Sequence, residues 1–179
     1  MPIEIVFETH ALTEENERGI ATGWLPGRLS ARGRDNTAAM GYRRREDGIT
    51  AVFSSDLRRS LETAEIAFAQ TDIPVFLDWR LRECDFGTLN GAPAAHVSNI
   101  RVEHIDQPFP DGESHRQAVR RTVGLFGDLS SRWDHQRIML IGHLATYRAL
   151  ENVTTGVSLE DIVATDFSWR PEGWEYRLG

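Results

Sequence analysis

Residues 3–10 read IEIVFETH, and residues 138–143 read IMLIGH. Both stretches are short runs of apolar and β-branched residues, and each ends in a histidine, His10 or His143. We predict that the two runs are strands of one parallel sheet. Ligands of open α/β sheets bind at the carboxyl ends of such strands, so the sequence predicts two imidazoles in one crevice.

Between and beyond these runs, strand patterns alternate with helix patterns. Short apolar runs predict strands over residues 49–53 and 73–77, and strict alternation predicts an edge strand over residues 174–178. N-cap residues and apolar positions at helical spacing predict helices over residues 30–45, 57–68, 94–103, 114–133, 143–156 and 158–163. Residues 8–29 are expected to form a loop. We therefore predict an α/β fold, a three-layer αβα sandwich with a mostly parallel central sheet.

The length and charge of the chain limit its organisation and its partners. A chain of 179 residues is long enough to bury a sizeable core, and we expect one domain over residues 1–179. It carries 20 basic and 27 acidic residues, for a formal net charge of -7. Because an acidic protein repels phosphate backbones and anionic headgroups, we expect neither nucleic acid nor a membrane as a partner.

Cysteine usage and the lack of targeting patterns predict a cytoplasmic location. The single cysteine, Cys84, excludes an internal disulfide and fits a reducing compartment. The sequence has no apolar run long enough to cross a bilayer and no amino-terminal signal pattern. The histidines outside the two strand ends show no metal-ligand spacing, so we expect no metal and no cofactor; they are His96, His104, His115 and His135.

The segments that follow the predicted strands contain groups suited to phosphate chemistry. His10 is a candidate nucleophile, because a neutral imidazole can attack phosphorus and carry the phosphoryl group. Arg59 begins a helix and can hold two phosphate oxygens at once. Glu83 is a candidate proton donor to the leaving oxygen. His143 and the backbone amide of Leu144 could stabilise charge on the transferred group.

With these motifs in order, the chain resembles the histidine phosphatase superfamily, whose fold is phosphoglycerate mutase-like. The family's opening signature, Arg-His-Gly-Glu-Thr, corresponds to residues 9–13, THALT, and Asn16 stands at the family's asparagine, six residues after the histidine. Further family signatures correspond to residues 23–33, 54–64, 81–91, 112–114 and 142–148. Each pattern is weak by itself, but their order and separations together are specific.

The resemblance implies roles for the matching residues. Arg59 falls on the family's second phosphate-binding arginine, and Glu83 falls in its acid-bearing loop. Thr9, Thr13 and Asn16 fall in the segment that binds the substrate, with Asn16 among the groups that hold phosphate oxygens. Thr13 and Asn16 are equally well explained as loop-capping residues.

Two departures from the family pattern affect the expected activity. The family's first arginine is Thr9 here, and its flanking glycines are replaced at Ala11, Leu144 and Ala145. Losing a charge-assisted contact would cost about 2–4 kcal/mol of transition-state stabilisation, or about 10²- to 10³-fold in rate. We hypothesise that Arg28, or else Arg18, reaches the crevice and replaces the missing charge.

The resemblance implies a metal-independent phosphomonoesterase that acts through a phosphohistidine on a small phosphorylated substrate. Mutases of the family carry a long insertion in the loop that corresponds to residues 83–112, and this chain has a short loop there, which favours a phosphatase. Thr9 supports one alternative, a catalytically weakened member that binds a phosphorylated ligand or a partner protein. A phosphoglycerate mutase-like enzyme of other specificity is a second alternative. The oligomeric state is left open, with a homodimer as one alternative.

Overall fold

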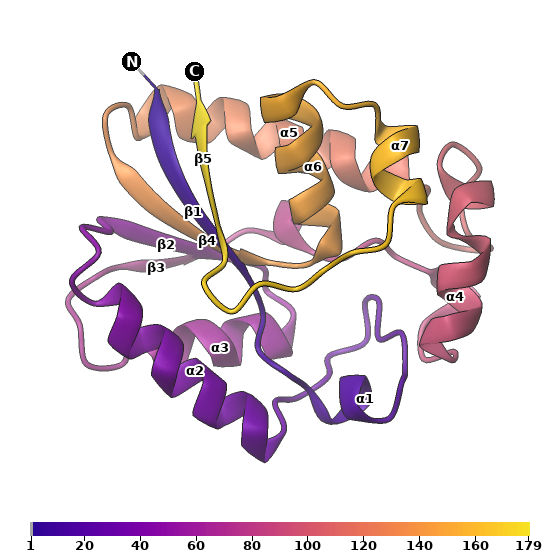
Figure 1. Cartoon of the computed structure of the whole chain (residues 1–179), viewed down its shortest axis with the longest axis horizontal. Helices are drawn as coiled ribbons and strands as arrows, with labels where there is room; N and C mark the ends of the chain where they lie inside the picture. The colour runs from indigo at the N-terminus through magenta and orange to yellow at the C-terminus, as the bar shows by residue number, and fades with distance from the viewer. Residues whose placement is uncertain (1) are drawn as a thin grey trace.

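A five-stranded sheet with the order β3-β2-β4-β1-β5 organises the computed structural model, which describes residues 2–179 (Figure 1). Four of the strands are parallel, and β5 pairs antiparallel with β1 at one edge. The strands span Ile3–Thr9 (β1), Ala51–Ser54 (β2), Val75–Leu77 (β3), Arg137–Gly142 (β4) and Trp174–Leu178 (β5). The expected α/β sandwich with a mostly parallel sheet is confirmed.

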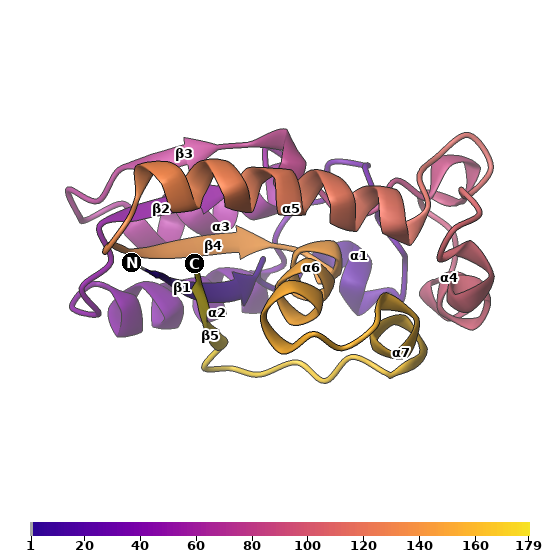
Figure 2. The ribbon, with the colours of Figure 1, turned by 90° about the horizontal axis from the view of Figure 1, so that it is seen from above.

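Helices cover both faces of this sheet. In Figure 1, α2 (Ala31–Arg44) and α3 (Arg58–Phe68) lie below the strands, while α5 (His115–Arg132) and α6 (Leu144–Thr155) lie above them. Figure 2 shows α5 running along the sheet, with the two termini side by side at one end. The shorter helices are α1 (Glu14–Glu17), α4 (Ala94–Ile100) and α7 (Leu159–Ala164). Among the described residues, no helix combines the length and the apolar composition that crossing a bilayer requires.

The two faces of each central strand supply two separate cores. On β1, Ile5 and Phe7 pack toward α5 and α6, while Val6 between them packs toward α2 and α3. On β4, Leu140 joins the first core and Met139 the second. Each of these side chains is fully buried, which contributes about 1.5–3 kcal/mol of hydrophobic stabilisation per residue. Strands that are apolar on both faces are typical of a covered parallel sheet.

The structure differs from the expected elements mainly at their ends and in one loop. Residues 8–29 are not all loop, because Thr13 caps the one-turn helix α1. The helix expected over residues 94–103 becomes a 3-10 helix after Ile100. The strand expected over residues 73–77 begins only at Val75, since Pro74 has no N–H to give to the sheet.

A tight turn delivers the last strand to the sheet edge. Gly173, just before β5, has a φ of +69°, and a Cβ there would lie 2.5 Å from the carbonyl oxygen of Phe7 and from Cγ of Glu8. Only glycine fits this close approach without strain. The turn therefore holds Gly173 against Phe7 and Glu8, near the carboxyl end of β1.

Candidate active site

The fold brings His10 and His143 together at the carboxyl edge of the sheet. β1 and β4 are neighbouring parallel strands with Thr9 opposite Gly142, so the residue after each strand is a histidine at the same level. The centroids of the two imidazole rings are 5.0 Å apart, and the rings are inclined by 52°. The pairing of these two strands therefore places both imidazoles in one crevice.

His10 is held with one ring nitrogen directed at the crevice. Nδ1 lies 2.8 Å from the carbonyl oxygen of Ala11, and Nε2 lies 3.2 Å from Nε of Arg59. Because a guanidinium can only donate, Nε2 accepts and Nδ1 carries the proton. Burial first, and the charge of Arg59 second, lower the pKa of His10 to about 3. At neutral pH, His10 is an uncharged imidazole with a lone pair on Nε2.

His143 is the N-cap residue of α6 and is almost fully buried. Nδ1 lies 3.3 Å from Nη2 of Arg59, and Nε2 lies 2.7 Å from Oγ of Ser55. The same reasoning makes Nδ1 the acceptor and gives the proton to Nε2, which donates to Ser55. Burial, followed by the charge of Arg59, lowers the pKa of His143 well below its usual value. Ser55 therefore orients this imidazole, a role that its position after β2 did not reveal.

Arg59 joins the two histidines to the loop that follows β1. Its Nη1 donates to the carbonyl of Leu25 and its Nη2 to the carbonyl of Gly23, both at a distance of 2.8 Å. The side chain is buried, and this burial lowers the pKa of Arg59 to about 10, so it stays protonated at neutral pH. Thr63, one turn further along α3, accepts from the amide of Ala11 at 3.0 Å and donates to the carbonyl of Arg59. These bonds fix the guanidinium against both rings.

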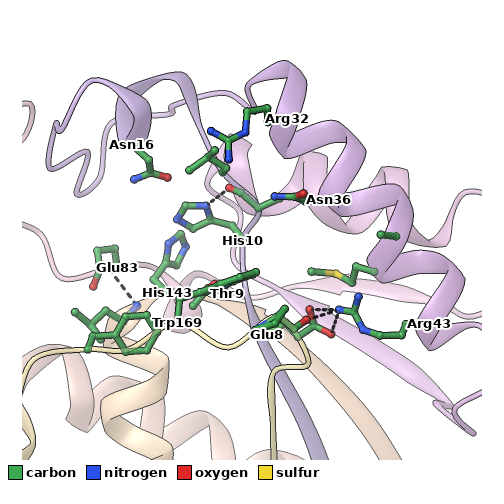
Figure 3. A pocket seen from close by; sticks show the side chains of 17 residues that line it. Glu8, Thr9, His10, Asn16, Arg32, Asn36, Arg43, Glu83, His143 and Trp169 are labelled. Carbon is green, nitrogen blue, oxygen red and sulfur yellow. Dashed lines mark hydrogen bonds and ion pairs between the residues drawn. The ribbon is translucent and has the colours of Figure 1, made fainter.

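Glu83 lies at the amino end of α6, beside His143. Its Oε1 accepts from the amides of Cys84 at 2.8 Å and Ala145 at 3.2 Å, and its Oε2 accepts from the amide of Leu144 at 3.2 Å (Figure 3). The amide of Leu144, expected to face the substrate, is therefore engaged by this carboxylate. The amino end of a helix is a favourable place for a carboxylate, which explains the arrangement.

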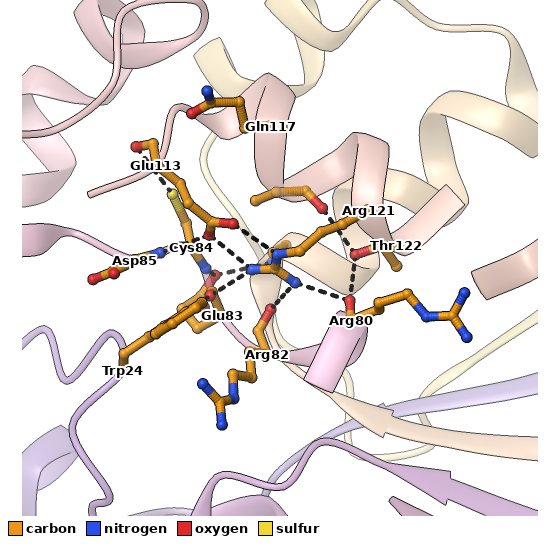
Figure 4. Close-up of polar contacts among 12 residues, drawn as sticks. Trp24, Arg80, Arg82, Glu83, Cys84, Asp85, Glu113, Gln117, Arg121 and Thr122 are labelled. Carbon is orange, nitrogen blue, oxygen red and sulfur yellow. Dashed lines mark hydrogen bonds and ion pairs between the residues drawn. The ribbon is translucent and has the colours of Figure 1, made fainter. Parts of the chain in front are cut away.

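The backbone of the Glu83 loop is held from two sides. Nε1 of Trp24 donates to the carbonyl of Glu83 at 2.7 Å, and Nη2 of Arg121 donates to the same oxygen at 2.8 Å. Nη1 of Arg121 also donates to the carbonyls of Arg80 and Arg82 (Figure 4). Trp24 thus braces the Glu83 loop and is not part of the cavity wall.

Some residues of the first motif line the cavity, and others are buried in the protein. Thr9 and Asn16 line the cavity, but Thr13 is fully buried and does not. The hydroxyl of Thr13 accepts from the amide of Asn16, and Oδ1 of Asn16 accepts from the amide of Thr13, which makes a capping box for α1. The expectation that Thr13 binds the substrate is therefore corrected: its side chain is used to cap a helix.

The two arginines expected to replace the missing charge point elsewhere. Nε of Arg28 forms an ion pair with Glu14 at 3.1 Å, and Arg18 contacts the carboxylate of Glu15. Both arginine side chains are mostly exposed, and neither lines the cavity. The acidic residues that begin α1 attract both guanidinium groups and hold them outside. The assignment of Arg28 to substrate binding is therefore corrected.

A cavity of about 560 Å³ opens beside the histidines, between α2 and residues 167–171. Its wall on α2 includes Arg32, Asn36 and Arg43, which recur at helical spacing and so face one side. Arg43 is bonded to Glu8, whereas Arg32 has no hydrogen-bond or ion-pair partner among the described residues. The helical spacing of these three polar residues is visible in the sequence, but no motif identified them as residues of the site.

The other four histidines lie outside this cavity. One of them, His115, is buried, and its Nδ1 lies 3.0 Å from Nη1 of Arg148. Burial, and then the charge of Arg148, lower the pKa of His115 to about 2. Within residues 2–179, no group of three or more His, Cys, Asp or Glu side chains is placed to hold a metal ion.

Comparison with known proteins identifies a family whose model matches most of this chain. The family model described as histidine phosphatase superfamily (branch 1) matches residues 5–169. A 2,3-bisphosphoglycerate-dependent phosphoglycerate mutase from Staphylococcus haemolyticus is 28% identical, with 89% of this chain and 88% of the relative covered. A protein of the same name from Neisseria meningitidis is 25% identical, with coverages of 92% and 90%.

Solved structures share the fold across almost the whole chain. A mycobacterial glucosyl-3-phosphoglycerate phosphatase in complex with VO3 superposes with a TM-score of 0.84 at 22% identity, covering 98% of this chain and 92% of that one. A putative alpha-ribazole-5'-P phosphatase from Escherichia coli gives a TM-score of 0.76 at 20% identity, covering 90% and 83%. At these identities the likeness establishes a common architecture.

Proposed function

Because the chain belongs to the histidine phosphatase superfamily (branch 1), we propose that it hydrolyses a small phosphomonoester through a phosphohistidine. The observation that carries the proposal is the uncharged imidazole of His10, whose Nε2 faces Arg59 and lies beside His143. A neutral imidazole next to a buried guanidinium is suited to attack on a phosphate ester, because the cation offsets the charge of the incoming oxygens.

The proposed reaction has two steps. Glu83 enters the first step as the protonated acid. Nε2 of His10 forms a bond to phosphorus as the bond between phosphorus and the ester oxygen breaks, and Glu83 gives its proton to that oxygen and becomes a carboxylate. Water then attacks the phosphohistidine, Glu83 takes a proton from the water, and phosphate leaves with His10 restored. Arg59, His143 and Asn16 hold the oxygens of the transferred group. Each proton and each bond is accounted for without a further reactant.

The proposal is tested by hydrolysis of 4-nitrophenyl phosphate in the presence of excess EDTA. We expect turnover to persist in the chelator, and rapid quenching to trap an acid-labile, base-stable phosphoryl group on His10, located by mass spectrometry. Turnover that stops in EDTA and returns with a divalent cation would contradict the metal-independent part. Steady turnover with no trapped phosphohistidine, even with a fast-leaving ester, would contradict the nucleophile.

The two alternatives remain distinguishable in the same preparation. The binding-only alternative rests on Thr9, which brings a hydroxyl where the family has a guanidinium. It predicts binding of phosphate without release of nitrophenol after long incubation. A mutase-like activity predicts interconversion of 2- and 3-phosphoglycerate faster than their hydrolysis, which ³¹P NMR would detect.

We propose that Arg32 supplies the positive charge that Thr9 lacks. Arg32 lines the same cavity as Thr9 and His10, and no acidic side chain of the described residues neutralises it (Figure 3). We expect Arg32→Met to lower kcat/KM for 4-nitrophenyl phosphate by about 10- to 100-fold, the effect of losing one charged contact to phosphate. Steady-state kinetics at low ionic strength would measure it.

Two matched variants and one rescue control this prediction. Arg28→Met and Arg18→Met remove the same charge outside the cavity and should change kcat/KM less than about twofold, because exposed ion pairs contribute little. Adding Thr9→Arg to Arg32→Met should restore activity by placing a guanidinium in the family position. A large loss in Arg28→Met, or an unchanged rate in Arg32→Met, would assign the charge to another residue.

A further inference from the structure

We propose that the part of the cavity between α2 and residues 167–171 is a leaving-group subsite for phosphate esters of flat aromatic alcohols. Trp169 would be the stacking surface and Asn36 the polar contact. The inference rests on the proposed function, since it names the alcohol that the phosphatase releases. It begins from the size of the cavity: about 560 Å³ is far more space than one phosphate occupies and lies in the range that holds drug-sized molecules.

The two walls of this subsite come from segments far apart in the sequence. Figure 3 places Arg32 and Asn36 on α2 on one side of the cavity and Trp169 on the other, with the histidines at one end between them. The Trp169 side chain is 56% exposed although it lines a concave site. An indole left open to water in a cavity wall is a ready surface for a planar ligand, because aromatic rings gain from both burial and stacking.

The charged side chains around Glu8 are paired with one another. Glu8 is buried, and both of its oxygens accept from Nη2 of Arg43, at 3.1 and 2.9 Å. Arg44 donates to Glu8 as well, at 2.7 Å. A second phosphate or a carboxylate on the substrate would therefore meet arginines that are already paired here, since Arg32, which is unpaired among the described residues, is assigned to the transferred phosphoryl group, whereas a neutral group would meet no repulsion.

The remaining lining favours an aromatic group over a sugar. Near this end the wall is apolar at Ala39, Met40 and Phe167, and the side chain of Asn36 has no hydrogen-bonded partner among the described residues. A sugar would bring several hydroxyl groups, and each one buried without a partner costs free energy. A flat aromatic group needs few polar contacts and gains from the apolar wall.

The wall that carries Trp169 is held in place. Nη2 of Arg43 donates to the carbonyl of Pro171 at 2.8 Å, which ties the segment to α2. Phe167 packs edge-on against Tyr147, with ring centroids 5.1 Å apart, and lies 5.6 Å from the ring of Trp174. An aromatic platform on a fixed backbone loses little conformational freedom when a ligand stacks on it.

The test compares two esters whose leaving oxygens are both aliphatic, so that their chemical reactivity is similar: 2-(2-naphthyl)ethyl phosphate and glycerol 3-phosphate. We expect the protein to favour the naphthyl ester by about 10- to 100-fold in kcat/KM. Trp169→Ala should remove most of this preference through a higher KM, and Trp169→Phe should keep most of it. Either variant should change kcat/KM for glycerol 3-phosphate much less than kcat/KM for the naphthyl ester.

Tyr42→Ala is the matched control, since Tyr42 is an exposed aromatic residue on α2 that does not line the cavity. Equal losses for both esters in Trp169→Ala, or a preference for glycerol 3-phosphate or a sugar phosphate, would overturn the subsite. Calorimetry with 2-naphthylmethylphosphonate and methylphosphonate separates this outcome from failure of the proposed function. Tighter binding of the naphthyl compound that Trp169→Ala abolishes would support the subsite even without turnover, and equal binding of the two would reject it.

Discussion

Replacement of His10 by glutamine is expected to lower kcat for phosphomonoester hydrolysis by about 10⁴-fold or more, because it removes the proposed nucleophile. Glutamine can keep a donor near the carbonyl of Ala11, but its amide nitrogen has no lone pair for attack on phosphorus. Rapid-quench and steady-state assays with 4-nitrophenyl phosphate would measure the loss. No phosphorylated protein should be trapped in this variant.

His96→Gln is the matched control, because His96 is exposed on α4 and lies outside the cavity. It should leave kcat unchanged within about twofold. Binding of inorganic phosphate separates a lost nucleophile from a lost site: His10→Gln should still bind it through Arg59. Near-normal turnover in His10→Gln would remove His10 from the mechanism, whatever the other residues do.

Mild acid is expected to destabilise the protein strongly. Burial lowers the pKa of His10 to about 3 and of His115 to about 2, and the pKa of His143 lies well below its usual value. Between about pH 6.5 and pH 3 the unfolded chain therefore binds more protons than the folded protein, so stability falls as the pH falls. His10 and His115 each cost about 2 kcal/mol between pH 7.5 and pH 5, or about 4 kcal/mol together, and His143 lowers the stability in the same direction.

Urea unfolding in phosphate-free buffers from pH 7.5 to pH 5 would measure this dependence, since bound phosphate would itself stabilise the folded state. His115→Gln is the informative variant, because His115 lies outside the cavity. This variant should reduce the decrease in the free energy of unfolding between pH 7.5 and pH 5 by about 2 kcal/mol, whatever its effect on stability at neutral pH. The expectation fails if the free energy of unfolding is constant over this pH range. It also fails if the free energy of unfolding of the variant depends on pH as steeply as that of the unmodified protein.

Much of the fold could be predicted because its patterns are local. The runs that end at His10 and His143 are apolar on both faces, as a covered parallel strand must be, and Ser30 and Ser114 mark helix starts by their capping chemistry. The ends of weak elements were less predictable. β3 is exposed at the sheet edge, where pairing and the proline before it decide where the strand starts.

Only the site residues that belong to short sequence motifs could be predicted. His10 and His143 each follow a recognisable strand and Arg59 stands near the start of a helix, so their backbone positions were implied, whereas Glu83 was indicated only by the family's acid-bearing loop. Where a long side chain points is decided by its neighbours in space. Arg28 precedes α2 and was expected inside, but Glu14 is near enough to hold it outside, while Arg32, one helical turn further on, faces the cavity.

The sequence by itself determined the sheet, the two histidines at its edge and the family, because period, spacing and motif order are properties of the chain. The tertiary structure alone decided which unpaired cation of the described residues lines the cavity beside the histidines and which residues form the opposite wall. Arg32 and Trp169 are separated by more than half the chain and carry no shared motif. They line one cavity because the segment that carries Trp169 leads into β5, which pairs with β1 at the edge of the sheet, while α2 packs on one face of that sheet. No local sequence pattern predicts this contact.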